Sequence, residues 1–242
     1  MDGALPRVVG TAELTVFTAA QLLDVTSAIM AILALPRSVN KLDAVVVPTG
    51  QGEQWRLTHA IDRWETDPDL RCLLVANGNP AERTYQEITM SYLGGLGLRR
   101  LDGVHVQAEP APNTGLQAEW IADRARALGI TSLAISVSAY HLPRVYLTVL
   151  SALERRDLRV RLIPDPVPVP ADAAAPETGA TGYALLPGEI ERILTYAGKG
   201  WLATPEQLRH YLRWWWAEYS GQADRIATLT PANGGEETFL SS

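Results

Sequence analysis

Four polar side chains that could bind a ligand or move a proton follow one short apolar run at residues 133–137. They are Ser138, Tyr140, His141 and Arg144. An apolar run of this length is typical of a strand buried on both faces of a parallel sheet. A helical pattern begins directly after it, at about residue 142. The sequence therefore predicts that a strand delivers these side chains to a site at its carboxyl end.

His141 and Arg144 form the sharpest pair in this group. They lie three residues apart at the start of the expected helix, so they face similar directions. The helix dipole disfavours a cation there, so Arg144 is expected to meet an anion: Glu87, or a phosphate or carboxylate of a ligand. His141 could act as a general acid or base, because its ordinary pKa is near neutrality. It could equally be a hydrogen-bonding residue in the wall of the site.

Three other apolar runs also end in polar segments, at residues 48–52, 77–80 and 109–114. Glycine there allows close approach to a ligand or positive φ, or simply a tight turn. Asn or Thr at a helix start either caps the helix or leaves its N–H groups to bind an anion. The candidate ligand-binding residues are Gly50, Gly52, Arg56, Asn77, Gly78, Asn113, Thr114 and Gln117, and Glu87 joins His141 as a candidate for proton transfer.

An alternation of strand and helix patterns must position these side chains. The expected elements are strands at 43–47, 72–76, 104–108, 132–137 and 160–163, and helices at 53–65, 81–93, 115–128 and 142–155. This repetition predicts an α/β protein with a doubly wound, mostly parallel sheet of about five strands. Ligands bind such sheets outside the carboxyl ends of the strands, so the polar segments are expected to line one cleft.

The rest of the chain is expected to complete a single domain. Helical spacing over residues 11–35 predicts one long helix, or two with a break near residues 24–27. Prolines after residue 163 favour extended backbone, and the small residues at 171–182 predict a mobile loop. Two more helices are expected at 186–197 and 205–219. The expected organisation is one domain over 1–220, with a helical segment (1–40), a core sheet (43–164), a mobile loop (165–185), C-terminal helices (186–220) and a fraying polar tail (221–242).

Composition argues against several classes of partner. The chain of 242 residues has a formal net charge of −6 and no block of like charge, so no nucleic-acid partner is expected. No apolar span reaches the roughly 18–20 residues of a membrane helix. The start of the chain also lacks the charged and apolar regions of a signal peptide. We therefore expect no membrane association and a cytoplasmic location.

Missing motifs narrow the chemistry further. A single cysteine, Cys72, excludes an intramolecular disulfide and a multi-cysteine zinc site. His59, His105 and His210 have no metal-ligand spacing with an acid, so no metal site is predicted. Neither the G-x-x-x-x-G-K-[ST] phosphate loop nor the G-x-S-x-G elbow occurs.

Three consecutive tryptophans, Trp214, Trp215 and Trp216, fall within the last expected helix. Three successive helical positions span about 200°, so one helix face cannot bury all three. The alternatives are packing against the N-terminal helix and sheet, a homodimer interface, because aromatic residues are enriched there, or an apolar lid over the ligand.

The polar segments resemble, in order, the motifs of the YdcF/SanA/ElyC-like family. D-A-V-V-V at 43–47, followed by Gly50, Gly52, Arg56 and Ala60, is similar to its first strand, glycines and R-x-x-x-A helix. N-G-N at 77–79 with Glu87 is similar to its glycine pair and downstream Glu, with Asn79 in place of one glycine.

The later motifs follow the same order. N-T-G-L-Q-A at 113–118 is similar to N-T-x-x-N-[AS], with Gln117 in place of the second Asn. S-V-S-A-Y-H-L-P-R at 136–144 is close to [ST]-S-x-[YF]-H-x-x-R. P-G-E-I-E-R-I-L-T-Y at 187–196 is similar to the YdcF-like branch, and its Glu189 and Arg192 are expected either as an exposed or structural pair or as site residues.

The resemblance covers residues 43–196 and implies a Rossmann-like sheet with extra N-terminal and C-terminal helices. The YdcF-like branch is associated with binding S-adenosylmethionine, and the membrane-anchored branches with cell-envelope and lipid-carrier metabolism. The leading hypothesis is a YdcF-like protein that binds S-adenosylmethionine or a related nucleotide-like anionic molecule. If it is an enzyme, metal-free group transfer or cleavage is expected. The alternatives are a non-catalytic ligand-sensing module and a hydrolase or transferase acting on a phosphorylated or lipid-linked envelope precursor.

Overall fold

A single five-stranded parallel sheet forms the centre of the protein. The computed structural model describes residues 8–37, 39 and 41–229, with side chains up to residue 220. The strand order is β3-β2-β1-β4-β5, and every neighbouring pair is parallel. The strands are β1 (Ala44–Pro48), β2 (Cys72–Ala76), β3 (Val104–Val106), β4 (Ser132–Ser138) and β5 (Arg161–Val167). The expected Rossmann-like, doubly wound α/β fold is confirmed.

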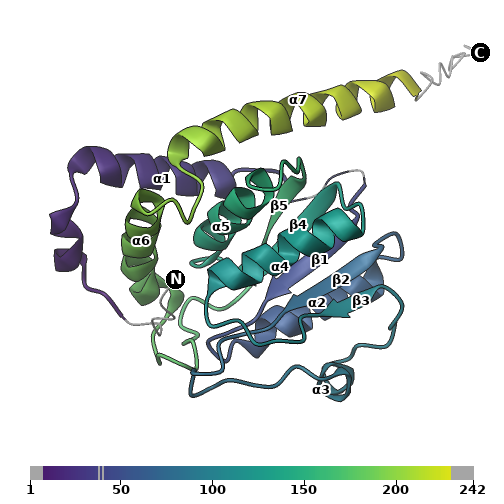
Figure 1. Cartoon of the computed structure of the whole chain (residues 1–242), viewed down its shortest axis with the longest axis horizontal. Helices are drawn as coiled ribbons and strands as arrows, with labels where there is room; N and C mark the ends of the chain where they lie inside the picture. Colours follow the sequence, from purple (N-terminus) through teal and green to yellow (C-terminus); the bar gives the residue numbers. More distant parts are fainter. Residues whose placement is uncertain (1–7, 38, 40, 230–242) are drawn as a thin grey trace, which may run out of the picture.

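Helices cover both faces of this sheet (Figure 1). On one face, α2 (Gln54–Thr66) and the short α3 (Met90–Gly95) pack with alternate residues of β1 and β2. On the other, α4 (Thr114–Ala127) and α5 (Leu142–Glu154) pack with the remaining residues of the same strands. The continuous apolar runs of the strands are explained by this coverage, because both faces of each strand are buried.

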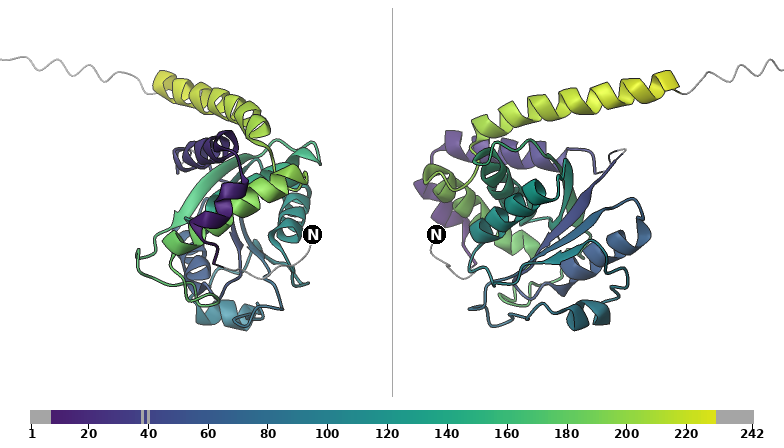
Figure 2. Two further views of the ribbon diagram at one scale, coloured as in Figure 1. Left: turned by 90° about the vertical axis from the view of Figure 1, so that its left-hand side faces the viewer. Right: turned by 45° about the vertical axis from the view of Figure 1, so that its right-hand side comes forward.

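An outer layer of helices lies beyond α5. It comprises the 3-10 helix η1 (Thr11–Val16), α1 (Ala19–Leu33), α6 (Gly182–Gly198) and α7 (Pro205–Leu229). Figure 2 shows α7 lying across α1, and α1 also contacts α5 and α6. Consequently α5 is covered on its outer side as well, and almost all of its side chains are buried. None of the helices in the described part of the chain is long and apolar enough to cross a membrane.

The prediction of a helix over residues 81–93 is wrong for most of that range. Only Met90–Gly95 is helical, and Thr89 caps it by accepting a hydrogen bond from the Tyr92 N–H. Upstream, the backbone N–H groups of Arg83 and Thr84 donate to the carboxylate of Glu177 instead, at 3.0 and 2.8 Å. A partner 94 residues away in sequence therefore takes the donors that a helix would use.

Several expected boundaries also move. β5 continues to Val167 through Pro164 and Pro166, which an edge strand paired only with β4 can tolerate. The expected mobile loop is shortened to residues 168–181, because α6 already begins at Gly182. The break in the N-terminal helices falls at residues 17–18, where Thr18 and Gln21 form a capping box.

The C-terminal helix is longer than expected. It runs to Leu229, so residues 221–229 are helical and do not belong to a tail. Residues 1–7 and 230–242, which include the rest of the expected tail, lie outside the described residues. Trp215 is fully buried and donates its indole N–H to the Leu162 carbonyl, whereas Trp216 is 43% exposed. Packing accounts for Trp215, and the homodimer stays a prediction.

Candidate functional site

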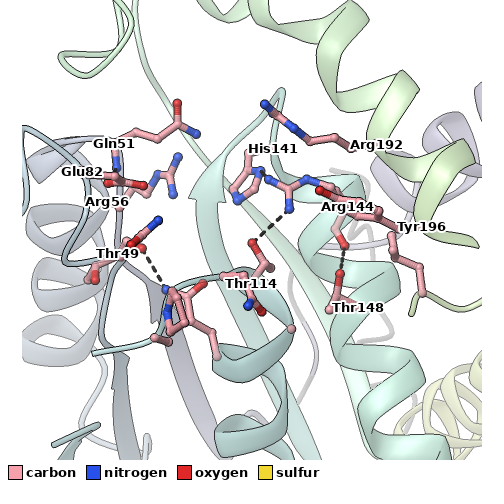
Figure 3. A pocket seen from close by; sticks show the side chains of 18 residues that line it. Thr49, Gln51, Arg56, Glu82, Thr114, His141, Arg144, Thr148, Arg192 and Tyr196 are labelled. Carbon is pink, nitrogen blue, oxygen red and sulfur yellow. Dashed lines mark hydrogen bonds between the residues drawn. The ribbon is translucent and has the colours of Figure 1, made fainter. Parts of the chain in front are cut away.

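The candidate site lies where the strand order reverses, between the carboxyl ends of β1 and β4. The helices that follow these two central strands, α2 and α5, pass to opposite faces and leave a crevice between them. A cavity of about 80 Å³ occupies this position (Figure 3). Of the predicted site residues, those that line it are Gly50, Arg56, Asn113, Thr114, Gln117, His141 and Arg144.

Glu189 of α6 is the centre of an ion-pair cluster beside the cavity. Its carboxylate accepts hydrogen bonds from Arg144 Nε at 2.6 Å and from Arg192 Nη1 at 2.9 Å. It also lies 3.0 Å from Nδ1 of His141, and its exposed fraction is only 1%. Burial by itself raises the pKa of Glu189, but Arg144 and His141 hold that pKa well below its ordinary value. The protein anion that Arg144 meets is thus Glu189, and the prediction that it could be Glu87 is wrong. Glu189 itself is buried, so its pair with Arg192 is not an exposed one.

The surroundings of His141 keep its imidazole neutral. Burial, with the positive charge of Arg144, lowers its pKa to about 3. Nδ1 of His141 lies 3.0 Å from the Glu189 carboxylate and 3.1 Å from Arg144 Nη2, which is a donor. Because Glu189 is ionised and can only accept, it favours the tautomer that carries the proton on Nδ1. Nε2 is then an acceptor, and no group in the described part of the chain donates to it. The histidine therefore presents an oriented lone pair, as a general base requires.

The start of α4 faces the same cavity. Asn113 caps the helix by accepting a hydrogen bond from the Leu116 N–H. Thr114 and Gly115 stand in the first turn, where backbone N–H groups have no partner within the helix. The Thr114 hydroxyl also accepts a hydrogen bond from Arg144 at 3.0 Å (Figure 3). A helix amino terminus and an arginine therefore meet at one end of the cavity.

A second buried network of hydrogen bonds and an ion pair adjoins the cavity at Arg56. Arg56 forms an ion pair with Glu53, and the Glu53 carboxylate accepts hydrogen bonds from Ser138 at 2.9 Å and Tyr140 at 3.0 Å. Ser138 and Tyr140, predicted as ligand-binding residues, are therefore turned toward Glu53 and do not line the cavity. Sequence reasoning missed Glu53, although its spacing of three residues before Arg56 is typical of a helical ion pair.

The loop after β1 has a strained backbone at the cavity mouth. Gly50 and Gly52 have φ of 145° and 67°, and Gln51 between them has φ of 57°. Left-handed backbone is unfavourable for a residue with a side chain, and such strain persists only where its surroundings enforce it. Gln51 is 5% exposed, and its side-chain oxygen is buried without a hydrogen-bond partner. No sequence signal identified Gln51.

Two predicted residues hold the loops together. Gln117 lines the cavity and donates from its amide to the carbonyls of Thr49 and Asn77, both at 2.9 Å. Asn77 does not line the cavity, and its side-chain oxygen accepts from the Gly78 N–H. Gly78 lies so close to Thr49 that an added Cβ would be 3.3 Å from the Thr49 hydroxyl. These positions shape the floor of the site.

Glu87 is exposed and does not line the cavity, because the helix expected to carry it is absent. Glu82, which sequence reasoning missed, lines the cavity instead. Its carboxylate accepts a 2.5 Å hydrogen bond from the Gln51 N–H. Burial, together with the negative charge of Glu177, raises the pKa of Glu82.

A second hollow of about 220 Å³ adjoins the cavity and shares Thr49, Gly50 and Glu82 with it. Its other lining residues include Gly52, Gly78, Leu57, Tyr85, Ile88 and Tyr92. Tyrosine and aliphatic side chains line this hollow together with the polar side chains of Glu53, Gln54, Thr84 and Gln86. The cavity and the hollow together offer arginine and tyrosine side chains to one ligand.

Comparisons of the chain with protein families, with curated proteins and with solved structures find no match. The resemblance to the YdcF-like branch therefore stays a prediction. In the part of the chain that the structure describes, no group of three or more His, Cys, Asp or Glu side chains is placed to hold a metal ion.

Proposed function

We propose that the cavity and the adjoining hollow bind a nucleotide-like, anionic small molecule, and that S-adenosylmethionine is the first compound to test. The observation that carries the proposal is that Arg144, Arg192 and the start of α4 line one cavity, in which Arg144 also contacts Thr114. Phosphate and carboxylate groups prefer such a combination of guanidinium and backbone N–H donors.

The adjoining hollow supports the nucleotide-like part of the proposal. Tyr85 and Tyr92, with Leu57 and Ile88, offer aromatic and apolar walls to a planar base. Because the hollow shares lining residues with the cavity, one ligand can reach both. The resemblance to the YdcF-like branch implies the same class of ligand.

His141 is the residue that would move a proton if the bound ligand reacts. Glu189 orients its ring, and the Nε2 lone pair is available at neutral pH. The lining residues include no hydroxyl or thiol in contact with Nε2, so the base would act on the ligand or on water. Group transfer or cleavage on the ligand is then the expected reaction.

A second candidate is hydrolysis of a phosphate ester or of a related envelope precursor. It rests on the same neutral histidine beside an anion-binding helix terminus. The histidine could activate water for attack on a phosphoryl group bound at that terminus. A ligand-sensing module would use the same cavity without turnover.

Calorimetry of the full chain with S-adenosylmethionine, its demethylated product and simple phosphate esters separates these functions. Replacing His141 by Ala or Arg144 by Gln should weaken binding about 10-fold or more, since each removes a buried polar partner. Arg155→Gln, which alters an exposed ion pair with Glu119, is the matched control. If no adenosyl compound binds the parent protein, the leading proposal is wrong. Binding without turnover after long incubation supports the sensing module.

A further inference from the structure

The two ends of the cavity carry opposite charge. On the side of α4, α5 and α6, Arg144 and Arg192 share the single carboxylate of Glu189. On the side of the β1 and β2 loops, Arg56 stands against two carboxylates, Glu53 by ion pair and Glu82 by longer-range attraction. The first side therefore has one excess positive charge, and the second has one excess negative charge.

Each of these two sides also carries an acceptor without a protein donor. The Gln51 side-chain oxygen is buried and accepts no hydrogen bond. His141 is 4% exposed, and its Nε2 has no donor in the described part of the chain. Buried polar atoms are nearly always paired, so the Gln51 oxygen calls for a ligand that donates, and His141 lines the same cavity. Figure 3 shows Gln51 and His141 on opposite sides of the cavity.

From this arrangement we propose that the cavity recognises an α-amino-acid head group. Its carboxylate would lie at Arg144, Arg192 and the first turn of α4. Its ammonium would donate to His141 Nε2, the Gln51 oxygen and the Glu82 carboxylate. The inference rests on the proposed function, and it assigns the amino-acid end of S-adenosylmethionine to the cavity and the nucleoside end to the aromatic hollow.

Charge and size both favour this head group over a plain anion. A fully ionised phosphate ester would satisfy Arg144 and α4, but it has only acceptors and offers no donor to His141 or Gln51. A hydroxy acid could donate to His141, yet it would leave the charge of Glu82 uncompensated. The cavity volume of about 80 Å³ has room for several groups of the size of water, which an ammonium and a carboxylate on one carbon require.

The decisive experiment compares two ligands with the same nucleoside by calorimetry on the full chain. S-adenosylhomocysteine has the amino-acid head group, and 5′-methylthioadenosine lacks it. The second should bind about 30-fold or more weakly, because it forms none of the charge-assisted contacts. Gln51→Leu should weaken S-adenosylhomocysteine about 10-fold and leave 5′-methylthioadenosine unchanged, because Gln51 lines the cavity and not the hollow. Glu82→Gln should weaken S-adenosylhomocysteine more than 5′-methylthioadenosine, because Glu82 lines both. Glu109→Gln, which removes an exposed acid outside both hollows, should change neither.

The outcomes separate this inference from the proposed function. Equal affinity for the two nucleosides would overturn the inference and leave the proposed function standing. If neither nucleoside binds, the proposed function is wrong. Calorimetry with L-methionine and with its decarboxylated amine, each at millimolar concentration, then tests the inference on its own. Binding of the amino acid but not of the amine upholds the head-group site, whereas binding of neither, or of both equally, overturns it. Because the ligand comparisons use the parent protein, they stay decisive even if a variant does not fold.

Discussion

At the scale of the residue, Glu189 determines the state of the site more than any other side chain. Its carboxylate neutralises Arg144, fixes the tautomer of His141 and holds Arg192 at the cavity rim. Without that charge, two guanidinium groups would be left near each other in a poorly hydrated position. In the sequence Glu189 stood out only as part of a motif, yet the ion-pair cluster beside the cavity depends on it.

Replacing Glu189 by Gln should lower the free energy of unfolding by about 3–5 kcal/mol, because it leaves buried cations without a counter-ion. Urea denaturation at pH 7 measures this loss. The matched control is Glu119→Gln, since Glu119 also lies between two arginines, Arg155 and Arg156, but is 34% exposed. That variant should lose about 1 kcal/mol or less. Equal losses in the two variants would mean that burial of Glu189 is not what makes it important.

At the scale of the element, the strand-end loops are held by one another. An added Cβ at Gly52 would lie 2.8 Å from Cβ of Thr84 in the loop after β2. Glu177, from the segment after β5, binds Thr84 and donates its own N–H to the Gln51 carbonyl. The loop conformations are therefore set jointly by three segments that are distant in sequence.

Gly52→Ala should lower the free energy of unfolding by about 2–4 kcal/mol, through left-handed backbone strain and the contact with Thr84. Gly94→Ala is the comparison, because Gly94 lies in α3 and an added Cβ meets nothing within 4 Å. Alanine there should raise stability by about 0.5–1 kcal/mol. A neutral result for Gly52→Ala in urea denaturation would show that the loops rearrange without cost.

At the scale of the whole molecule, stability should depend on pH through His141. Its pKa is about 3 when folded, against about 6.5 in an unfolded chain. The unfolded chain therefore binds a proton first as the pH falls. The stabilisation is complete above about pH 6.5 and is lost progressively toward pH 3, by up to about 1.4 kcal/mol per pH unit. Urea midpoints measured between pH 7 and pH 4 should fall accordingly.

In His141→Gln this dependence between pH 6.5 and pH 4 should be much weaker. Asp43 causes a second loss of stability at lower pH. Hydrogen bonds from Thr131 and Ser132 outweigh the effect of burial and lower the pKa of Asp43. That contribution is present above about pH 4 and is lost only as the pH falls further. A parent protein whose stability is flat from pH 7 to pH 4 would contradict the neutral, buried state of His141.

The sequence by itself determined the sheet, its parallel strands and seven residues that line the cavity. Continuous apolar runs and periodic helices are local patterns, and parallel strands place their carboxyl ends at one edge. This is why local patterns are enough to assign Thr114, His141 and Arg144 to one site.

Only the tertiary structure decided which polar groups pair and which remain free. Glu177 keeps residues 83–84 out of a helix, so Glu82 replaces Glu87 at the cavity. Ser138 and Tyr140 turn to Glu53 and leave His141 facing the cavity. These pairings depend on partners distant in sequence and on the exclusion of water from the paired groups. Local sequence patterns contain no information about either.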